Sequence, residues 1–435
     1  MVLRGAGRWP TVIVRRLLGH GPLPPHAAFR LKILLSVAVA FCIEAAFHVR
    51  WYAVPRPLQD LDAPFSTQCQ DPVATAAANP RENATFVMLA RNNERHKALQ
   101  AIQNIENQFN QWFHYPVLFL NDEPWDPEFV RALNASVSGE ATFEVLKENE
   151  WSFPWWTNAN EARERMKAQG EQGIYNGGKE SYHHMCRFYS GTFYQLEALK
   201  KYKWYWRLEP GIEYTCAITY DPFFEMARHG KAYGFVIALW EVPETCPSLF
   251  RAVDEYRRKK SIEATSMWRA MVNPSWAPWP LRRLRGWFGG DHRDFGGDTW
   301  NLCHYWSNFE IADLDFFRGA AYQELFDHLD RAGGFYDERW GDAPVHSLAV
   351  HLLLPPEKLH HFSDIGYHHE PFFQCPGNAP GGQLTGSTVL PNGPNLSPES
   401  EGAIGCRCRC MDGRRRNNRP ICLNTLQSPA VLAPI

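Results

Sequence analysis

The chain has 435 residues, enough for one large catalytic domain or two ordinary ones. Its formal net charge of −2 argues against a nucleic-acid partner, because proteins that bind nucleic acids carry a surplus of basic residues. There are eleven cysteines, and Cys42 lies in an N-terminal apolar run. The other cysteines, together with N-glycosylation patterns at Asn83 and Asn134, predict disulfides in an oxidising compartment, with the pairing left open.

The N-terminal region has the pattern of a membrane anchor. Residues 1–30 are basic and contain no acidic residue, and a largely apolar stretch follows over residues 31–49. We therefore expect a cytoplasmic tail over residues 1–30, a signal-anchor over residues 31–49 and a stem over residues 50–83. The uninterrupted apolar core, residues 33–43, is shorter than the roughly 17 residues that usually span a bilayer, and Glu44 follows it. A removed signal peptide and a buried helix are the alternatives.

The first part of the folded body has a strand, helix, strand pattern. Residues 85–90 and 116–121 are short apolar runs typical of buried strands, and residues 95–109 carry apolar side chains at helical spacing. A third strand is expected over residues 142–146. This order is typical of a parallel sheet. No glycine fingerprint of a dinucleotide site follows the first strand, which argues against a nicotinamide enzyme.

The later elements are less regular. We expect residues 151–180 to be irregular, residues 181–199 to form one helix, and residues 234–239 to form one buried strand. A basic, tryptophan-rich surface insertion is expected over residues 251–295, and a loop over residues 333–346. Residues 377–435 are rich in Gly, Pro, Ser and Asn, which predicts a disordered tail whose cysteines form disulfides rather than a zinc site.

The stretch WYWRLEPGIEYTCAITYD, residues 204–221, is the most informative in the chain. Its aromatic residues favour a strand, and Pro210 and Gly211 end that strand, which holds Glu209 at the carboxyl end. Ligands of open α/β sheets bind at this edge, and a carboxylate there can hold a divalent cation against a phosphorylated substrate. The alternative is that Glu209 only forms an ion pair with Arg207 or a lysine.

Two more polar clusters follow apolar segments. Glu310 is accompanied by Asp313 and Asp315, and His368 by His369. Carboxylate and imidazole ligands together suit Mn²⁺ or Zn²⁺ better than Ca²⁺. The sequence leaves open whether these clusters converge on one site.

Five segments, in the same order, resemble the fungal α-1,2-mannosyltransferases of glycosyltransferase family 15. They are ESYHHMCRFYSG (residues 180–191), WRLEPGIEYTC (206–216), CHYWSNFEIADLDFFR (303–318), GGFYDERWGDAPVHS (333–347) and FSDIGYHHEPFFQCP (362–376). The resemblance covers residues 84–376. It implies a GT-A-like α/β nucleotide-sugar-binding fold: a single large domain with a mixed, mainly parallel central sheet. It also implies a single-pass type II Golgi membrane enzyme with a lumenal catalytic domain.

The resemblance implies an activity and a cofactor as well. Such an enzyme moves mannose from GDP-mannose to a mannosylated glycan acceptor, uses Mn²⁺, and retains the anomeric configuration. Glu209 and His369 are the implied ligands of Mn²⁺. Glu310 is the implied carboxylate at the anomeric carbon, either as a nucleophile that forms a glycosyl-enzyme or as a group that stabilises front-face attack.

Five further site residues are implied by the same resemblance. Tyr182 and Asp342 are catalytic-site residues, and Arg91, Arg207 and Glu241 belong to donor binding. The 251–295 insertion, the short membrane segment and the unusual tail cysteines depart from the family, and the insertion leaves the acceptor open between N-linked and O-linked glycans. The alternatives are an inactive mannan-binding relative and a transferase for a different GDP-sugar.

Overall fold

The computed structural model describes residues 25–52, 64–376, 404–410 and 421–427. Its central sheet consists of β1 (Ala84–Leu89), β2 (Val117–Asn121), β3 (Ala141–Val145), β4 (Trp204–Leu208), β6 (Tyr233–Phe235), β11 (Glu310–Asp313) and β12 (Leu359–His361). The strand order is β12-β6-β11-β4-β1-β2-β3. All neighbours pair in parallel except β11, which runs antiparallel to both β4 and β6. The expected mixed, mainly parallel sheet is confirmed.

Three smaller sheets accompany the central one. They are β5 (Glu213–Tyr214) with β13 (Tyr367–His369) and β14 (Phe372–Gln374), β7 (Ala238–Trp240) with β10 (Cys303–Tyr305), and β8 (Val272–Asn273) with β9 (Thr299–Trp300). The prediction of one strand over residues 234–239 is wrong, because the chain leaves the central sheet after Phe235 and β7 pairs elsewhere. Val236 and Ile237 at the break are buried, so the apolar run is continuous and gives no sign of the bend.

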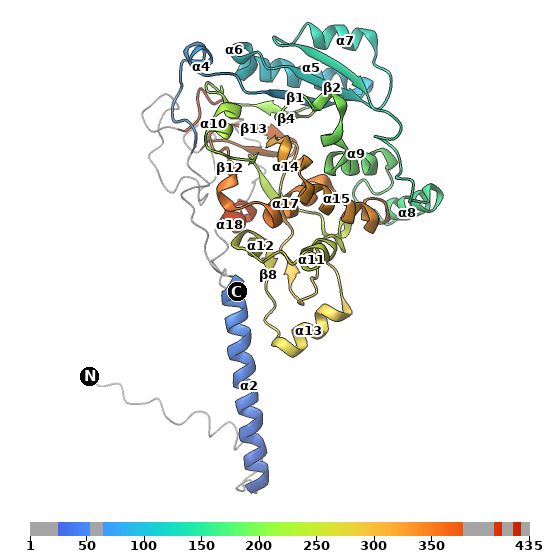
Figure 1. Ribbon diagram of the computed structural model, residues 1–435, viewed down its shortest axis with the longest axis vertical. Coiled ribbons are helices and arrows are strands. Elements are labelled where there is room, and N and C mark those ends of the chain that lie inside the picture. The colour runs from blue at the N-terminus through green and yellow to red at the C-terminus, as the bar shows by residue number, and fades with distance from the viewer. Residues whose placement is uncertain (1–24, 53–63, 377–403, 411–420, 428–435) are drawn as a thin grey trace, which may run out of the picture.

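Helices cover both faces of the sheet, and each face has its own apolar core (Figure 1). Alternate residues of β4 enter opposite cores, Trp204 and Trp206 on one face and Tyr205 on the other. The Trp face is covered by α5 (Arg95–Ile105), α6 (Gln111–Phe113), α7 (Pro127–Asn134) and α10 (Pro222–Arg228). The Tyr205 face is covered by α8 (Ala159–Glu171), α9 (Glu180–Ser190), α11 (Leu249–Lys259), α12 (Ser266–Ala270), α14 (Leu314–Arg318), α15 (Ala320–Ala332), α16 (Gly334–Asp337), α17 (Asp342–Leu353) and α18 (Ile421–Gln427).

Two regions that were not expected to form packed helices do so, because their many charged residues hide the apolar face of each helix. Residues 159–171, expected to be irregular, form α8, on which Ala162 and Met166 are the only buried apolar side chains. Much of the expected surface insertion packs into the core, since α11 buries Phe250 and Val253. Its arginines are not simply solvated: Arg257 and Arg258 both bond one buried carboxylate, that of Asp254.

Two helix boundaries also differ from the prediction. The helix expected over residues 181–199 ends at Ser190, and two 3₁₀ turns follow. A Cβ on Gly191 would lie 2.2 Å from the ring of Phe326, so only glycine allows this close approach. The loop expected over residues 333–346 is shorter than predicted, because α16 lies within it and α17 begins at Asp342, which places that carboxylate in the first turn of α17.

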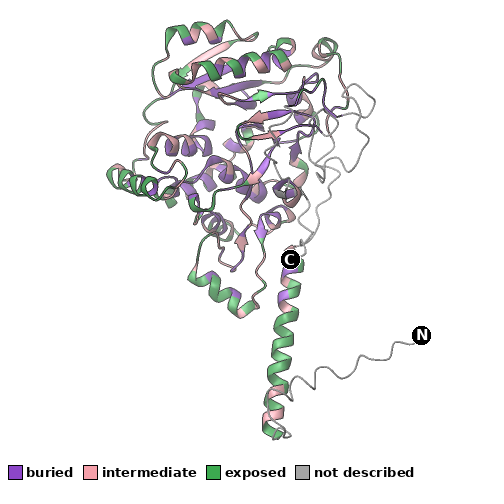
Figure 2. Ribbon diagram, turned by 180° about the vertical axis from the view of Figure 1, so that it is seen from behind, coloured by how far each residue is buried: buried purple, intermediate pink, exposed green. Residues whose placement is uncertain are grey.

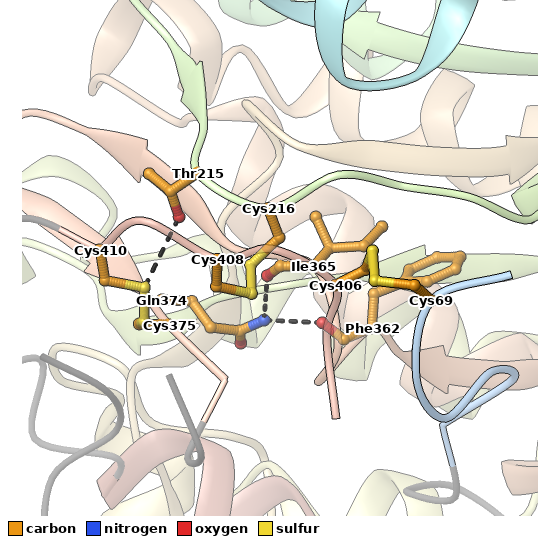
Figure 3. The surroundings of a disulfide bond; sticks show 10 residues. All are labelled: Cys69, Thr215, Cys216, Phe362, Ile365, Gln374, Cys375, Cys406, Cys408 and Cys410. Carbon is orange, nitrogen blue, oxygen red and sulfur yellow. Dashed lines mark hydrogen bonds between the residues drawn. A yellow bond between two sulfur atoms is a disulfide. The ribbon is translucent and has the colours of Figure 1, made fainter. Parts of the chain in front are cut away.

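The C-terminal tail is partly fixed to the domain, as Figure 3 shows for three disulfides. The disulfides are Cys69–Cys406, Cys216–Cys408, Cys375–Cys410 and Cys303–Cys422. The prediction of disulfides is confirmed, and the prediction of disorder is wrong for residues 404–410 and 421–427, because composition takes no account of covalent links. Residues 377–403, 411–420 and 428–435 lie outside the described residues.

The N-terminal region combines a projecting helix with a docked segment. α2 (Pro25–Tyr52) is long and apolar enough to cross a membrane, and it extends away from the domain (Figure 1). It therefore fits a single-pass anchor. Residues 64–83, expected as a stem, lie against the domain: they include α4 (Pro72–Ala78), and Phe65 stacks on His360 with ring centroids 3.5 Å apart. Residues 1–24 and 53–63 of the expected tail and stem lie outside the described residues.

Candidate active site

A cavity of about 900 Å³ lies at the carboxyl ends of β1, β2 and β4, where the sheet topology predicts a ligand site. Residues following each of these three strands line it, together with one side of α9. Four of the predicted site residues line this cavity, namely Arg91, Tyr182, Glu209 and His369. The other four are buried and are absent from its wall: Arg207, Glu241, Glu310 and Asp342.

Glu209 reaches the cavity because β4 ends one residue before it. The following turn contains Gly211 with a φ of 88°, a backbone conformation that favours glycine. One carboxylate oxygen of Glu209 accepts a hydrogen bond from Arg207 Nη2 at 2.5 Å, and the side chain remains 26% exposed. The ion pair considered from the sequence is therefore present, and Glu209 still faces the cavity.

His369, on β13, lines the same cavity. Its ring stacks on Trp306 with centroids 5.4 Å apart, and its Nδ1 lies 2.5 Å from the side-chain amide of Asn308. Burial lowers the pKa of His369 and outweighs the opposite effect of the nearby Glu209 charge. The imidazole is therefore neutral at pH 7, which is the form that binds a metal ion.

The donor set fits a divalent cation that also takes ligands from a substrate. Among the described residues, no cluster of three or more His, Cys, Asp or Glu forms a complete metal cage. A carboxylate and an imidazole suit Mn²⁺, and small cations of this kind often take their remaining ligands from substrate phosphates and water. Glu209 and His369 thus fit the implied Mn²⁺, provided that a nucleotide diphosphate supplies further ligands.

Asn308 provides a second observation in favour of that fit. Its Oδ1 is buried and has no hydrogen-bond partner among the described residues, while its amide nitrogen faces His369 Nδ1. Rotating the amide by 180° lets Oδ1 accept the Nδ1 proton and leaves Nε2 of His369 free as a ligand. Metal-binding histidines usually donate their other ring N–H in this way.

Arg207 lies beneath the cavity and connects two carboxylates. Its Nη1 donates to Asp342 at 2.5 Å, its Nη2 donates to Glu209, and its guanidinium lies 3.6 Å from the ring centroid of Tyr189. Burial alone would raise the pKa of Asp342, but the charges of Arg207 and His346 hold this pKa below its usual value. Asp342 is therefore ionised and acts on the cavity through Arg207.

Glu310 is fully buried on β11, directly opposite Arg207 in the antiparallel pair. One carboxylate oxygen accepts from the hydroxyl of Tyr205, and the other lies 2.9 Å from His346 Nδ1. Burial would lower the pKa of His346, but the Glu310 charge and hydrogen bond raise it above its usual value. The Glu310–His346 pair is thus a buried ion pair below the cavity floor.

Glu241 lies behind Tyr182. The guanidinium of Arg339 is 5.4 Å from the ring centroid of Tyr182 and 3.4 Å from the Glu241 carboxylate. Glu241 also accepts hydrogen bonds from Val242 N and Thr245 Oγ1, which hold the turn after β7. Its position makes it a support of the cavity wall through Arg339.

Residues 59–380 match the model of the family described as glycolipid 2-alpha-mannosyltransferase. The chain belongs to this family. Among curated relatives, it is 36% identical to O-glycoside alpha-1,2-mannosyltransferase homolog 4 of Schizosaccharomyces pombe, over 89% of this chain and 87% of that protein. It is 42% identical to the glycolipid 2-alpha-mannosyltransferase of Saccharomyces cerevisiae, over 74% of this chain and 70% of the relative.

Solved structures support the same family. Core-mannan synthase A of Aspergillus fumigatus, in its Mn/GDP form, matches with a TM-score of 0.65 and 33% identity, over 86% of this chain and 91% of that one. The mannosyltransferase Ktr4p of S. cerevisiae, in complex with GDP, matches with a TM-score of 0.62 and 30% identity, over 78% and 82% of the two chains. The predicted family, the GT-A-like fold and the glycosyltransferase class are confirmed.

Within this family fold, three site residues escaped the sequence analysis. Tyr189 lies seven residues after Tyr182 on α9 and lines the same cavity, so helical spacing was an available signal. Asn308 belongs to the quoted segment that contains Glu310, but its contact with His369 is visible only in three dimensions. Asp122 lines the cavity after β2 and binds Arg91 through two hydrogen bonds of 3.2 and 2.9 Å.

Proposed function

We propose that this chain is a type II Golgi membrane enzyme that transfers mannose from GDP-mannose to a mannose hydroxyl of a glycan, with Mn²⁺ and with retention of configuration. The observation that supports this most strongly is the cavity that Glu209 and a neutral His369 share at the carboxyl edge of the sheet, in a chain of this family. Solved relatives are described with GDP and with Mn.

Each predicted residue on the cavity wall has a role in the proposal, and residues behind the wall support it. Glu209 and His369 would hold Mn²⁺. When bound, this ion would act as a Lewis acid that neutralises the diphosphate and helps GDP to leave. Asn308 orients the ring of His369, and Arg207 orients the carboxylate of Glu209. Arg91 contacts the donor nucleotide, and Asp122 holds its guanidinium in place. Tyr182 lies on the cavity wall where the transferred sugar would bind, with Glu241 supporting it through Arg339.

Burial of Glu310 bears on the two routes to retention. A nucleophile must approach the anomeric carbon, and both carboxylate oxygens of Glu310 are occupied by Tyr205 and His346. We therefore favour front-face attack, in which Glu310 and Asp342, whose charges His346 and Arg207 offset in part, contribute the remaining negative potential beneath an oxocarbenium-like transition state. The two-carboxylate mechanism of glycosidases applies here only by analogy.

The test of the metal site is a transfer assay with the purified full-length chain, GDP-mannose, an α-mannoside acceptor and Mn²⁺. Glu209→Ala is expected to abolish transfer and to weaken Mn²⁺-dependent GDP binding. Glu213→Ala is the matched control, because Glu213 lies four residues away, is half exposed and does not line the cavity. Full activity of Glu209→Ala would contradict the site. NMR of the product gives the linkage and anomer, and a panel of GDP-sugars tests the donor.

A second experiment distinguishes the two routes. Glu310→Gln keeps the shape of the side chain and removes its charge. If Glu310 acts electrostatically, the variant is expected to retain reduced transfer with the same anomer, and mass spectrometry of the parent enzyme during turnover is expected to find no mannosyl adduct. A mannosyl ester on Glu310 would instead establish it as the nucleophile.

A further inference from the structure

The helix α13 (Trp279–Phe288) exposes an unusual number of large apolar side chains. Trp287 and Phe288 are 78% and 82% exposed and stack on each other with ring centroids 5.8 Å apart. The segment that begins three residues before α13 and ends with it contains six exposed large apolar side chains: Trp276, Trp279, Leu281, Leu284, Trp287 and Phe288. Figure 2 shows α13 as a mainly exposed helix at the end of the domain from which α2 projects. Apolar side chains gathered in this way mark a contact surface.

The exposed apolar side chains of α13 lie on the side that faces away from the domain. Arg282 and Gly286, one turn apart, are buried against the protein. Leu284 and Phe288, also one turn apart, lie about 120–160° around the helix from them at 100° per residue. Leu281 and Trp287 extend this apolar face, and Arg283 and Arg285 flank it on either side. An apolar face of Trp, Phe and Leu with basic flanks is typical of helices that lie in a membrane interface.

Glu44 of α2 joins this helix to the membrane anchor. One oxygen of its carboxylate accepts from Arg282 Nη2 at 2.6 Å, and the other accepts from the backbone N–H of Trp279 at 2.8 Å. The carboxylate thus binds the N-terminus of α13, where the helix dipole favours a negative charge. This contact also gives a role to the acidic residue that interrupts the apolar stretch of the anchor.

The position of Glu44 along α2 sets the depth of α13. Glu44 directly follows the uninterrupted apolar residues 33–43, so it marks the end of the hydrocarbon-spanning part. Beyond it, α2 continues along the domain: His48 lies 2.9 Å from Asp298, and Arg269 binds the Trp51 carbonyl at 2.8 Å. The anchor is thereby fixed to the domain, and α13 lies at the level where the apolar part of α2 ends (Figure 1).

We propose that α13 binds the lipid–water interface of the membrane that α2 crosses. Leu284, Trp287 and Phe288 enter the boundary between headgroups and acyl chains, and Arg283 and Arg285 contact lipid phosphates. The domain then lies directly on the bilayer, held at two points, α2 and α13. The proposal rests on α2 as the membrane anchor and is independent of the transfer activity.

Depth measurements on a spin label test the proposal. The full-length chain, with Cys42→Ser to remove its exposed thiol, is placed singly in phosphatidylcholine nanodiscs and labelled at Phe288→Cys. The control label is at Val73→Cys on α4, which is 65% exposed and lies at the other end of the domain from α13 (Figure 1). We expect dissolved oxygen to relax the label at 288 strongly and an aqueous nickel chelate to lose access to it, with the reverse at 73.

Equal access of the nickel chelate to both labels would overturn the proposal. Protection of the label at 288 that increases with the number of chains per disc would also overturn it, in favour of a second protein chain. A further variant, Leu281→Glu with Leu284→Glu, is expected to restore nickel access at 288. Transfer to a soluble acceptor should be unchanged in this variant, because α13 does not line the cavity, and this shows that the domain is folded. Continued protection in the folded variant would argue against insertion through the apolar face.

Discussion

Arg207 binds Glu209 and Asp342 simultaneously, with one guanidinium nitrogen 2.5 Å from each carboxylate. Asp342 is buried in the first turn of α17, whereas Glu209 faces the cavity. The guanidinium is itself buried beneath Tyr189. The cavity-facing acid is therefore oriented from behind by the protein, before any ligand is present.

Two substitutions of Arg207 should distinguish the contribution of its charge from that of its two-pronged hydrogen bonding. Arg207→Met leaves Asp342 buried without its partner and should lower the free energy of unfolding by about 3–5 kcal/mol. Arg207→Lys keeps the charge but loses the two-pronged geometry, so it should cost less stability and still weaken Mn²⁺ activation. Urea unfolding measures the stability, and transfer activity at increasing Mn²⁺ concentration measures the activation.

Arg187→Met is the control, because Arg187 pairs with buried Asp330 at 2.7 and 2.8 Å and does not line the cavity. A Mn²⁺ requirement unchanged in Arg207→Lys would refute the orienting role.

Asn308→Ala tests the orientation of His369. Loss of the amide removes the acceptor for the His369 Nδ1 proton, and such losses typically cost about 10–100-fold in metal affinity. Isothermal titration of GDP with Mn²⁺ measures the change. Asn301→Ala is the matched control, because Asn301 makes two hydrogen bonds to the backbone, with Ala270 and Cys303, and is absent from the cavity wall. Equal metal affinity in both variants would show that Asn308 does not act on the metal ligand.

Local chemistry made much of the sheet predictable. The apolar runs of β1 and β2 and the strand-ending turn after β4 placed Glu209 at the correct edge. The resemblance to the family supplied the other seven candidate residues, and three of these line the cavity. The position of β11 could not be predicted from the sequence. This strand lies antiparallel between β4 and β6, which buries Glu310 opposite Arg207. Strand order depends on contacts between residues far apart in the chain.

Charge and covalent links account for the other failures. The arginines of α11 conceal a helix that buries Phe250 and Val253, because two of them pair with the buried carboxylate of Asp254. The contact between Arg207 and Asp342 spans 135 residues and has no local signal. The tail composition is polar, but cysteine pairing, which spacing cannot assign, fixes two of its segments to the domain.

The tail disulfide Cys216–Cys408 should stabilise both the fold and the metal site. It closes a separation of 192 residues, and its loss typically costs about 2–5 kcal/mol. Cys216 follows β5, which pairs with β13, the strand of His369. The double variant Cys216→Ser with Cys408→Ser should therefore lower the melting temperature and weaken Mn²⁺-dependent GDP binding. Cys303→Ser with Cys422→Ser is the control, expected to lower the melting temperature alone. Equal metal affinity in the two double variants would show that the Cys216–Cys408 disulfide does not support the metal site.

His360 should make the fold less stable in mild acid. Its ring is buried between Phe65 and Phe362, and its Nε2 has no hydrogen-bond partner in the described part of the chain. Burial, with the charge of Lys231, lowers the pKa of His360 well below 6.5. In the unfolded chain this histidine takes up a proton as the pH falls through about 6.5, so the unfolded state binds more protons. Its contribution to stability is complete above that pH and is lost below it, by up to about 1.4 kcal/mol per pH unit.

The variant His360→Phe keeps an aromatic ring in the stack and removes the titrating group. Other buried histidines, such as His361, also have lowered pKa values, so the informative quantity is the difference between parent and variant. Urea unfolding of both chains at about pH 7.5 and about pH 5.5 should show the parent losing roughly 1.4 kcal/mol more than the variant. The same loss in the two chains would mean that His360 is already protonated in the folded state, contrary to the pKa shift that its burial imposes.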